Sequence, residues 1–227
     1  MNFFEICKEV ARDSGTVAGI PNFTTVAGAT GRVAQVVGWV RDAWIDIQNE
    51  RQDWLWLRER FEAPLTIAQM EYSPAELGIT RFAAWIPDRR DWQTMTLHDP
   101  ELGRADEGAI EMISFDEWRR RFDRGVHDAN RPHTWASSPQ RKLCVGNKPD
   151  KAYVIRGEYR KSAQRLLVDA DTPEMPEQFH RLIIAESIRL MARSDEAFQA
   201  LAAYGEEYVR LRSPLVIDQT PAVSLWP

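Results

Sequence analysis

Histidine is the residue type from which a metal site would most readily be built, and this sequence scatters its histidines. The four histidines are His98, His127, His133 and His180. Only His127 and His133 are close together, with Asp128 between them as a possible third ligand. A structural metal site needs a second Cys or His pair at ligand spacing, which the chain lacks. We therefore predict no metal site and no cofactor.

Acidic residues beside a lysine could form a nuclease-like cluster near residue 155. Asp150, Glu158 and Lys161 lie within one strand-like stretch, but a nuclease of that kind needs its second acid and its lysine on the same face. Residues three apart on a strand point to opposite faces, so the match fails. Asp169 and Asp171 could hold a divalent ion, but they precede a predicted helix, and we interpret them as charge complements of its N-terminus.

Other catalytic patterns are missing from the sequence. It contains no phosphate-binding glycine motif, no nucleophile elbow, no plausible triad and no well-spaced pair of carboxylates. The 227 residues are 44% hydrophobic and 28% charged, as in a folded protein. No apolar run approaches the roughly 18 residues that span a bilayer, and residues 1–10 lack the order of a signal peptide. We predict a non-enzymatic protein that is made in the cytoplasm.

Charge is distributed unevenly along the chain. Residues 1–118 have a net charge of −9, residues 119–165 of +9 and residues 166–227 of −5. The basic block could contact nucleic acid, an acidic surface of another copy of the chain, or only solvent. Its candidate residues are Arg119, Arg120, Arg121, Arg124, Lys142, Lys148, Lys151, Arg156, Arg160 and Lys161.

The N-terminal sixty residues are predicted to be mainly helical. Asn2 and Glu5 form a capping-box pattern before apolar residues at helical spacing, which predicts a helix to about Asp13. Residues 14–31 are rich in Gly and Thr and are predicted to form a long loop. A second helix is expected from Arg32 to about Arg51. Cys7 and Cys144 are too few for a disulfide framework, and we predict that both are reduced packing residues.

Strands are predicted to dominate residues 61–170. The segments 65–72 and 81–86 are strand-like, and residues 142–160 have the pattern of a hairpin with a Pro-Asp turn. One short helix interrupts them, with Ser114 as its N-cap and Glu117 three residues later. Gly125 is expected to end that helix.

Helices return in residues 171–212, where Ser194 is the predicted cap of a last helix that ends at Arg212. The predicted fold is α+β: a bundle of the N- and C-terminal helices with an inserted, mainly antiparallel sheet region. Pro214 is expected to stop the last helix, which leaves residues 213–227 as an extended tail. Its apolar residues need a cover, either this subunit's own core or another protein's groove. The candidate contacts are Pro214, Leu215, Val216, Ile217, Leu225 and Trp226.

Several ordered stretches resemble the head-to-tail adaptor (connector) proteins of tailed bacteriophages, similar in plan to tail tubular protein A. They are NFFEICKEVARDSG, AWIDIQNERQDWLWLRERF, FDEWRRRF to NRPHTWA, KPDKAYVIRGEYRK, and DADTPEMPEQFHRLIIAESIRLMA leading to YGEEYVRL. Each stretch alone has low specificity, but the series covers most of the chain in the right order. The resemblance implies that Trp44, Trp54 and Trp56 are core residues where the helices join the sheet region.

The resemblance further implies a structural protein of the virion neck. Such adaptors assemble as a homo-oligomeric ring, typically a dodecamer, between the portal protein and the tail or a tail-completion protein. Double-stranded DNA passes through the lumen without sequence recognition. A C-terminal extension docks into the portal in related adaptors, which makes the apolar tail residues candidate portal contacts. The alternative from the residues alone is a DNA-binding accessory protein that uses the basic block of residues 119–165.

Overall fold

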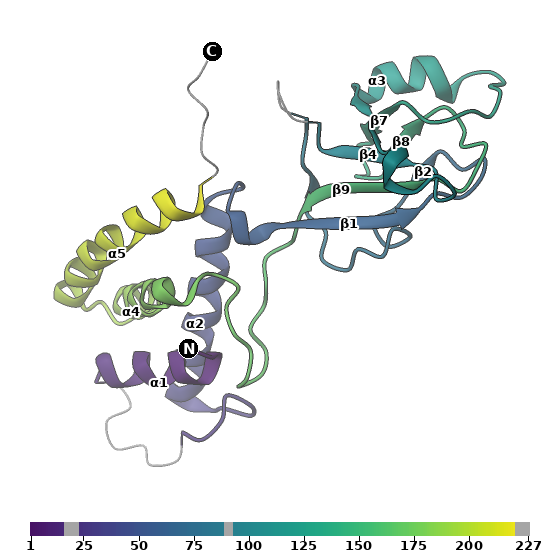
Figure 1. Cartoon of the computed structure of the whole chain (residues 1–227). Helices are drawn as coiled ribbons and strands as arrows, with labels where there is room; N and C mark the ends of the chain where they lie inside the picture. Colours follow the sequence, from purple (N-terminus) through teal and green to yellow (C-terminus); the bar gives the residue numbers. More distant parts are fainter. Residues whose placement is uncertain (16–22, 89–92, 221–227) are drawn as a thin grey trace. The chain divides into compact units, whose positions relative to one another are not determined.

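The protein divides into two compact units in a computed structural model that describes residues 1–15, 23–88 and 93–220. The helical unit combines Met1–Leu57 with Ala163–Pro227, and the sheet unit is Arg58–Ser162. The chain therefore leaves the helical unit once and returns to it once (Figure 1). This mixture of helices and antiparallel-rich sheets confirms the predicted α+β class.

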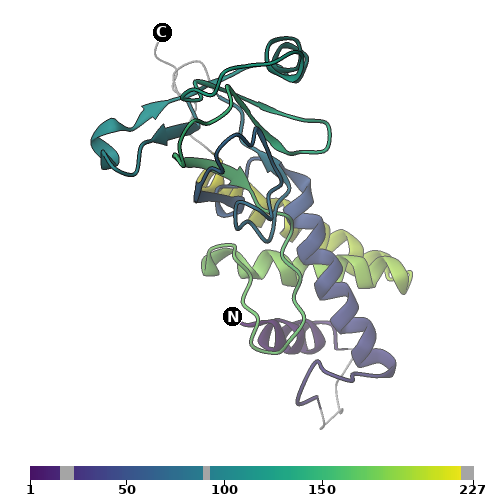
Figure 2. The ribbon, with the colours of Figure 1, turned by 90° about the vertical axis from the view of Figure 1, so that its right-hand side faces the viewer.

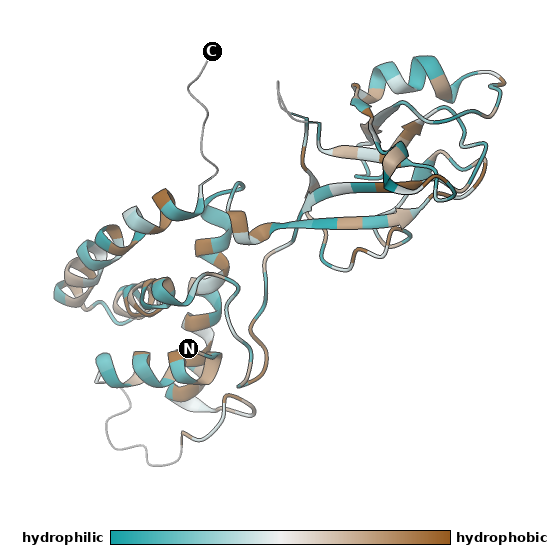
Figure 3. Ribbon diagram, viewed as in Figure 1, coloured by the Kyte–Doolittle hydropathy of each residue, from teal (hydrophilic) through white to brown (hydrophobic). Residues whose placement is uncertain are grey.

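The helical unit is built around α4. Its elements are α1 (Phe3–Asp13), α2 (Gly31–Glu50), the 3-10 turns η1 (Leu55–Leu57) and η4 (Glu177–Phe179), α4 (His180–Ser194) and α5 (Phe198–Gln219). Helix α4 contacts α1, α2 and α5, and it lies between α1 and α5 in two perpendicular views (Figures 1 and 2). Apolar residues recur along these helices (Figure 3), and they form one continuous core.

The start of α1 confirms the predicted capping box. The Asn2 side chain accepts a hydrogen bond from the Glu5 amide at 2.8 Å, and the Glu5 carboxylate accepts one from the Asn2 amide at 2.9 Å. The first-turn amides of Phe3 and Phe4 donate to the backbone carbonyls of Asp171 and Asp169. The unpaired amides of a helix N-terminus are thus satisfied from both ends of the sequence. The second predicted helix is also confirmed, as α2.

The predicted stop of the last helix at Arg212 is wrong. Helix α5 begins at Phe198 rather than at Ser194 and continues to Gln219 with Pro214 inside it. A proline inside a helix loses one hydrogen bond and costs about 3 kcal/mol. Continuing the helix buries Leu215 completely in the core and packs Val216 against it. Burial of such side chains stabilises by about 1.5–3 kcal/mol each, which offsets the cost of the proline. Leu225 and Trp226 lie outside the described residues.

The strands that the structure describes in the sheet unit, residues 58–88 and 93–162, form two sheets. The larger one has the order β1-β9-β4-β5, and β3 also pairs with β9; all of its pairs are antiparallel. Its strands are β1 (Arg58–Pro64), β3 (Ala84–Trp85), β4 (Met95–His98), β5 (Gly108–Ala109) and β9 (Val154–Arg160). The smaller sheet has the order β2-β8-β7-β6, with β6 and β7 parallel. Its strands are β2 (Glu71–Tyr72), β6 (Glu111–Met112), β7 (Thr134–Ser137) and β8 (Leu143–Gly146).

The described residues of the sheet unit also form three short helical turns: η2 (Gly103–Asp106), α3 (Phe115–Trp118) and the π-helical η3 (Arg119–Asp123). Ser114 caps α3 as predicted, because its side chain accepts a hydrogen bond from the Glu117 amide. The strand-like segment 65–72 is a strand only at Glu71–Tyr72. The residues before it form turns, with Ala68 at a φ of 65° and the Tyr72 hydroxyl bonded to the carbonyls of Thr66 and Gln69.

The predicted hairpin of residues 142–160 has two correct strands and an incorrect pairing. Strand β8 pairs with β2 and β7, whereas β9 pairs with β1, β3 and β4. The burial patterns explain the difference. All four residues of β8 are buried, so this strand has both faces covered, whereas β9 alternates between buried and half-buried residues. Strand β9 finds a seven-residue antiparallel partner in β1, from Arg58↔Arg160 to Pro64↔Val154.

Gly157 in the middle of β9 generates a first prediction. A Cβ atom there would lie 2.0 Å from the sulfur of Met95 and 2.8 Å from the ring of Phe61. We expect Gly157→Ala to lower the free energy of unfolding by about 1–3 kcal/mol, the usual cost of overpacking. The measurement is urea unfolding. Gly38→Ala in α2 is the control, because nothing lies within 4 Å of the added carbon and alanine favours the helix by up to about 1 kcal/mol. Equal stability of Gly157→Ala and wild type would contradict this packing.

The proline-containing turn of α5 generates a second prediction. Leu215→Ala should destabilise the protein by about 2–5 kcal/mol, because it empties a buried site. Pro214→Ala should be neutral or stabilising by up to about 3 kcal/mol, because it restores a helical hydrogen bond. Chemical denaturation of both variants tests this pair. A neutral Leu215→Ala would show that residues 213–219 do not pack as α5.

Candidate interaction surfaces

The residues singled out for metal chemistry have other partners. The Nε2 atom of His127 lies 2.6 Å from the carbonyl oxygen of Arg124, and Nδ1 of His133 lies 3.1 Å from the side-chain amide of Asn147. Asp150 accepts a hydrogen bond from the hydroxyl of Tyr153. In the described parts of the chain, no three His, Cys, Asp or Glu side chains are grouped so that they could hold a metal ion.

The sequence predicted that Asp169 and Asp171 complement the N-terminus of the following helix. In the structure they instead order the chain next to α1. The Asp169 carboxylate accepts hydrogen bonds from the Val26 amide and the Thr25 hydroxyl, both at 2.7 Å. The Asp171 carboxylate accepts from two backbone amides, those of Val168 and Leu167, and these bonds lower its pKa. The next helical turn begins only at Glu177, so both carboxylates stabilise the loop before it.

Both cysteines are buried and unpaired, as predicted. Burial raises the pKa of the Cys7 and Cys144 thiols to about 12. The thiolate is the reactive form of cysteine, and a raised pKa keeps both thiols protonated. The two side chains are therefore unreactive and serve in packing. Cys7 belongs to the core of the helical unit, and Cys144 belongs to a small cluster beneath α3.

The arginine-rich segment at the start of the basic block is held firmly on the smaller sheet. Trp118 is buried, and its indole nitrogen donates to the carbonyl of Val145 in β8 at 2.9 Å. The ring of Phe122 packs against Gly146 of β8. A Cβ atom at position 146 would lie 2.7 Å from this ring, so the contact requires glycine there. The arginines between these anchors, Arg119, Arg120 and Arg121, are exposed, and so is Arg124 just after them.

Acidic neighbours engage much of the basic block. Arg121 pairs with Glu117 at 2.5 Å, and Arg119 lies 3.8 Å from Asp123. Further pairs join Lys142 to Glu71, Lys151 to Asp99, Arg131 to Asp106, and Arg156 to Glu62 and Glu107. Arg160 and Lys161 lie at the end of β9 and just beyond it, and both have interactions of their own. The sheet unit contains 18 basic and 17 acidic residues, so the basic block of the sequence is nearly neutralised within its own unit.

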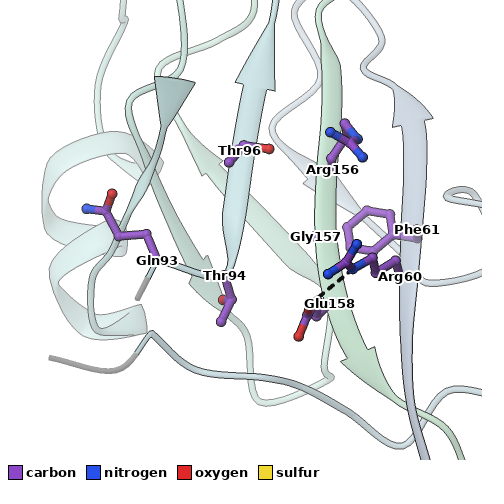
Figure 4. Close-up of a pocket in the computed structure, with 8 residues that line it drawn as sticks. All are labelled: Arg60, Phe61, Gln93, Thr94, Thr96, Arg156, Gly157 and Glu158. Atoms are coloured by element: carbon purple, nitrogen blue, oxygen red, sulfur yellow. Dashed lines mark hydrogen bonds and ion pairs between the residues drawn. The ribbon is translucent and has the colours of Figure 1, made fainter. Parts of the chain in front are cut away.

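A pocket on the charged face of the larger sheet has a volume of about 180 Å³ and is lined by side chains of β1, β4 and β9 (Figure 4). The charged residues that line it, Arg60, Arg156 and Glu158, are all engaged in ion pairs. Glu158 binds Arg58 and Arg60, and Arg156 binds Glu62 and Glu107. Cross-strand ion pairs of this type are typical of a solvated strand face.

A second ionic network fixes the loop after β4. Lys151 donates to Asp99 at 2.7 Å, and Arg131 holds Asp106 with contacts of 2.8 and 2.9 Å. The Asp106 carboxylate also accepts a hydrogen bond from the backbone amide of Asp99, and this bond joins the two ion pairs. The Lys151 ammonium and the Glu101 amide lower the pKa of Asp99. The Arg131 guanidinium and the Asp99 amide lower the pKa of Asp106.

The three tryptophans that the sequence analysis placed in the core are packed together at the end of the first helical-unit segment. Trp44 and Trp54 are fully buried, and Trp56 stacks on Trp54 with ring centroids 4.5 Å apart. The indole of Trp54 donates to the carbonyl of Ile47 at 3.0 Å, and that of Trp44 donates to the Gln164 side chain at 3.2 Å.

Sequence reasoning missed a pair of glutamines beside these tryptophans. The buried Gln48 amide donates to the carbonyls of Trp44 and Gln164 and accepts from the Gln164 backbone amide at 2.7 Å. Gln48 occurs on the apolar face of α2, which is a signal that could have been noticed. Its partner could not be identified, because 116 residues separate the two glutamines.

The candidate portal contacts are not equivalent. Leu215 is part of the core of the helical unit and Val216 is half-buried, so both pack within their own subunit. Pro214 is exposed, and Ile217 is 82% exposed on the surface of α5. Of the four candidate contacts that the structure describes, Pro214 and Ile217 are therefore the ones a partner could reach.

No helix in residues 1–15, 23–88 and 93–220 is long and apolar enough to cross a bilayer. The family model of the SU10 adaptor proteins matches residues 1–223, which is nearly the whole chain. The chain therefore belongs to the SU10 adaptor protein family. It is a phage head-tail adaptor, a structural class that functions in the virion neck. A comparison with curated proteins gave no match.

The ionic network of Asp99 and Asp106 predicts how stability depends on pH. Both carboxyls have lower pKa values folded than the usual unfolded value of about 3.9, so they stabilise the fold above that pH. This contribution is lost as the pH falls through their folded pKa values. We expect Asp99→Asn and Asp106→Asn to flatten the acid side of the stability profile, measured by thermal unfolding between pH 6 and about 3. Asp128→Asn, an exposed residue outside the network, is the control. Unchanged slopes in both test variants would contradict the network.

Proposed function

We propose that this adaptor forms a ring that joins the portal of the phage head to the tail and lines the passage for double-stranded DNA. The observation that carries the proposal is the match of residues 1–223 to an adaptor family. The likeness to tail tubular protein A noted in the sequence makes a dodecamer the expected ring size. The expected neighbours are the portal protein and a tail or tail-completion protein.

The charge distribution supports a passage that does not hold DNA tightly. Protein affinity for DNA rises with the number of phosphates that lysine and arginine neutralise. The sheet unit has a net charge of +1, the helical unit of −6, and many cations of the basic block are paired with carboxylates. This arrangement favours transit of DNA over stable DNA binding. A DNA-binding accessory protein would instead retain duplex DNA with a steep dependence on salt.

The portal contact is proposed for the exposed part of the C-terminus. Ile217 could reach a groove on another protein without disturbing the core, and Leu225 and Trp226, which lie outside the described residues, are proposed as further contacts. Leu215 and Val216 pack in the core of the helical unit and so hold the last turns of α5 in place. Deletion of the whole of residues 213–227 would remove the buried Leu215 and would therefore test folding as well as docking.

The sharper test combines Ile217→Asp with truncation after Thr220. We expect this variant to keep the wild-type unfolding midpoint and to lose most attachment to purified portal-bearing heads, measured by co-sedimentation. Val209→Asp is the matched control, because Val209 is a second exposed apolar residue on α5, at 63%. Undiminished attachment of the truncated variant would count against the portal assignment. Salt-sensitive retention of duplex DNA by the wild type would favour the accessory-protein alternative.

A further inference from the structure

The helical unit carries an apolar groove with an acidic rim. The groove has a volume of about 410 Å³ and lies between α2 and α4, where Trp39, Ile45 and Leu190 form its half-buried apolar lining. The carboxylates of Asp42 and Asp46 also line the groove, and both residues are exposed. A surface that combines apolar area with two like charges is suited to a segment that combines apolar area with the opposite charge.

Arg32 on α2 and Arg189 on α4, the two helices that border the groove, are already engaged. Arg32 pairs with Asp195, and its guanidinium lies over the ring of Trp39 at 4.6 Å. Arg189 holds Glu186 with hydrogen bonds of 2.7 and 2.5 Å. Within the described part of the chain, no ion pair is recorded for Asp42 or Asp46. Glu186 and, more weakly, Asp46 raise the pKa of the Arg189 guanidinium, so the charge of Asp46 is partly compensated, whereas that of Asp42 is available to an incoming partner.

The sheet unit carries a surface of the complementary kind. Its arginine tip, defined as residues 120–126, contains the exposed Arg120 and Arg124, and neither has a recorded ion pair to a described residue. Val126 follows them and is 97% exposed, which is the highest exposure among the large apolar residues that the structure describes. An apolar side chain so fully in water gains by burial in a partner. Trp118 and Phe122 fix the base of the tip on β8.

We propose that the arginine tip of one copy docks into the acidic groove of a neighbouring copy, with Arg120 and Arg124 facing Asp42 and Asp46 and Val126 against the apolar lining. This inference rests on the proposed ring, because it names two surfaces through which copies of the chain would meet. Tip and groove are different surfaces of the same chain. The contact is therefore heterologous, and repetition of it closes a ring when the rotation between copies permits.

Charge reversal tests this contact in the full-length protein. The groove variant is Asp42→Arg/Asp46→Arg, and the tip variant is Arg120→Glu/Arg124→Glu. Sedimentation velocity at rising protein concentration and low salt should show self-association of the wild type. Each variant alone should associate at least tenfold more weakly, because like charges then meet. Arg165→Glu/Arg193→Glu, which changes the net charge as the tip variant does at two exposed positions, should associate like the wild type.

Mixing the two variants shows whether the contact joins different chains. Each groove then meets a tip of opposite charge on the other variant, so an equimolar mixture should recover wild-type association. Recovery in a single chain that carries all four reversals, without recovery in the mixture, would show that tip and groove meet within one chain and would overturn the proposal. Wild-type association that neither variant weakens, or no wild-type association at any concentration, would also overturn it.

Parallel assays separate this inference from the proposed function. All variants are assayed for attachment to portal-bearing heads, and the tip variant also for retention of duplex DNA. If the wild type attaches to heads while the reversals leave self-association unchanged, the adaptor function stands and the tip-groove contact is wrong. Loss of DNA retention by the tip variant without loss of self-association would assign the arginines to phosphate contacts and likewise overturn the proposal. A wild type that fails to attach would contradict the function itself.

Discussion

Part-buried hydrogen bonds between Gln48 and Gln164 join the helical-unit segment that ends at Leu57 to the segment that begins at Ala163. The sheet unit is an insertion, so the segment before Arg58 and the segment after Ser162 must be kept in register although they are distant in sequence. Gln48 uses both ends of its amide for this, and Gln164 also accepts from the indole of Trp44 and from the Glu174 amide. A buried amide without partners costs about 1–3 kcal/mol, so any other register is penalised.

The stacked tryptophans lie beside this polar joint. Trp44 is fully buried and donates its indole N–H to the Gln164 side chain, and Trp56 stacks on both Trp44 and Trp54. The three indoles in thirteen residues are thus a packing device with a definite task. They pack beside the hydrogen-bonded glutamines, and this packing role needs no catalytic group next to them.

Local features of the fold could be predicted from the sequence, and non-local ones could not. The capping box of α1 and the apolar stripe of α2 depend on residues three or four positions apart, so periodicity finds them. The alternating pattern of β9 was also visible in the sequence, but its partner β1 lies about a hundred residues earlier. The two strands of the predicted hairpin therefore could not be assigned to different sheets from their own residues. Pro214 led to the wrong prediction that the last helix ends at Arg212. A strong local rule was overridden by tertiary packing of Leu215, which local patterns do not contain.

The same limit applies to the candidate surfaces. A net charge of +9 over residues 119–165 is a fact of sequence, but the acidic partners of Lys142, Lys151 and Arg156 come from residues 62–107. What remains after internal pairing decides what a surface can bind, and here that remainder is small: a few arginines beside an exposed valine on one unit, and two carboxylates beside a groove on the other. In the proposed ring each copy supplies one tip and one groove from different units.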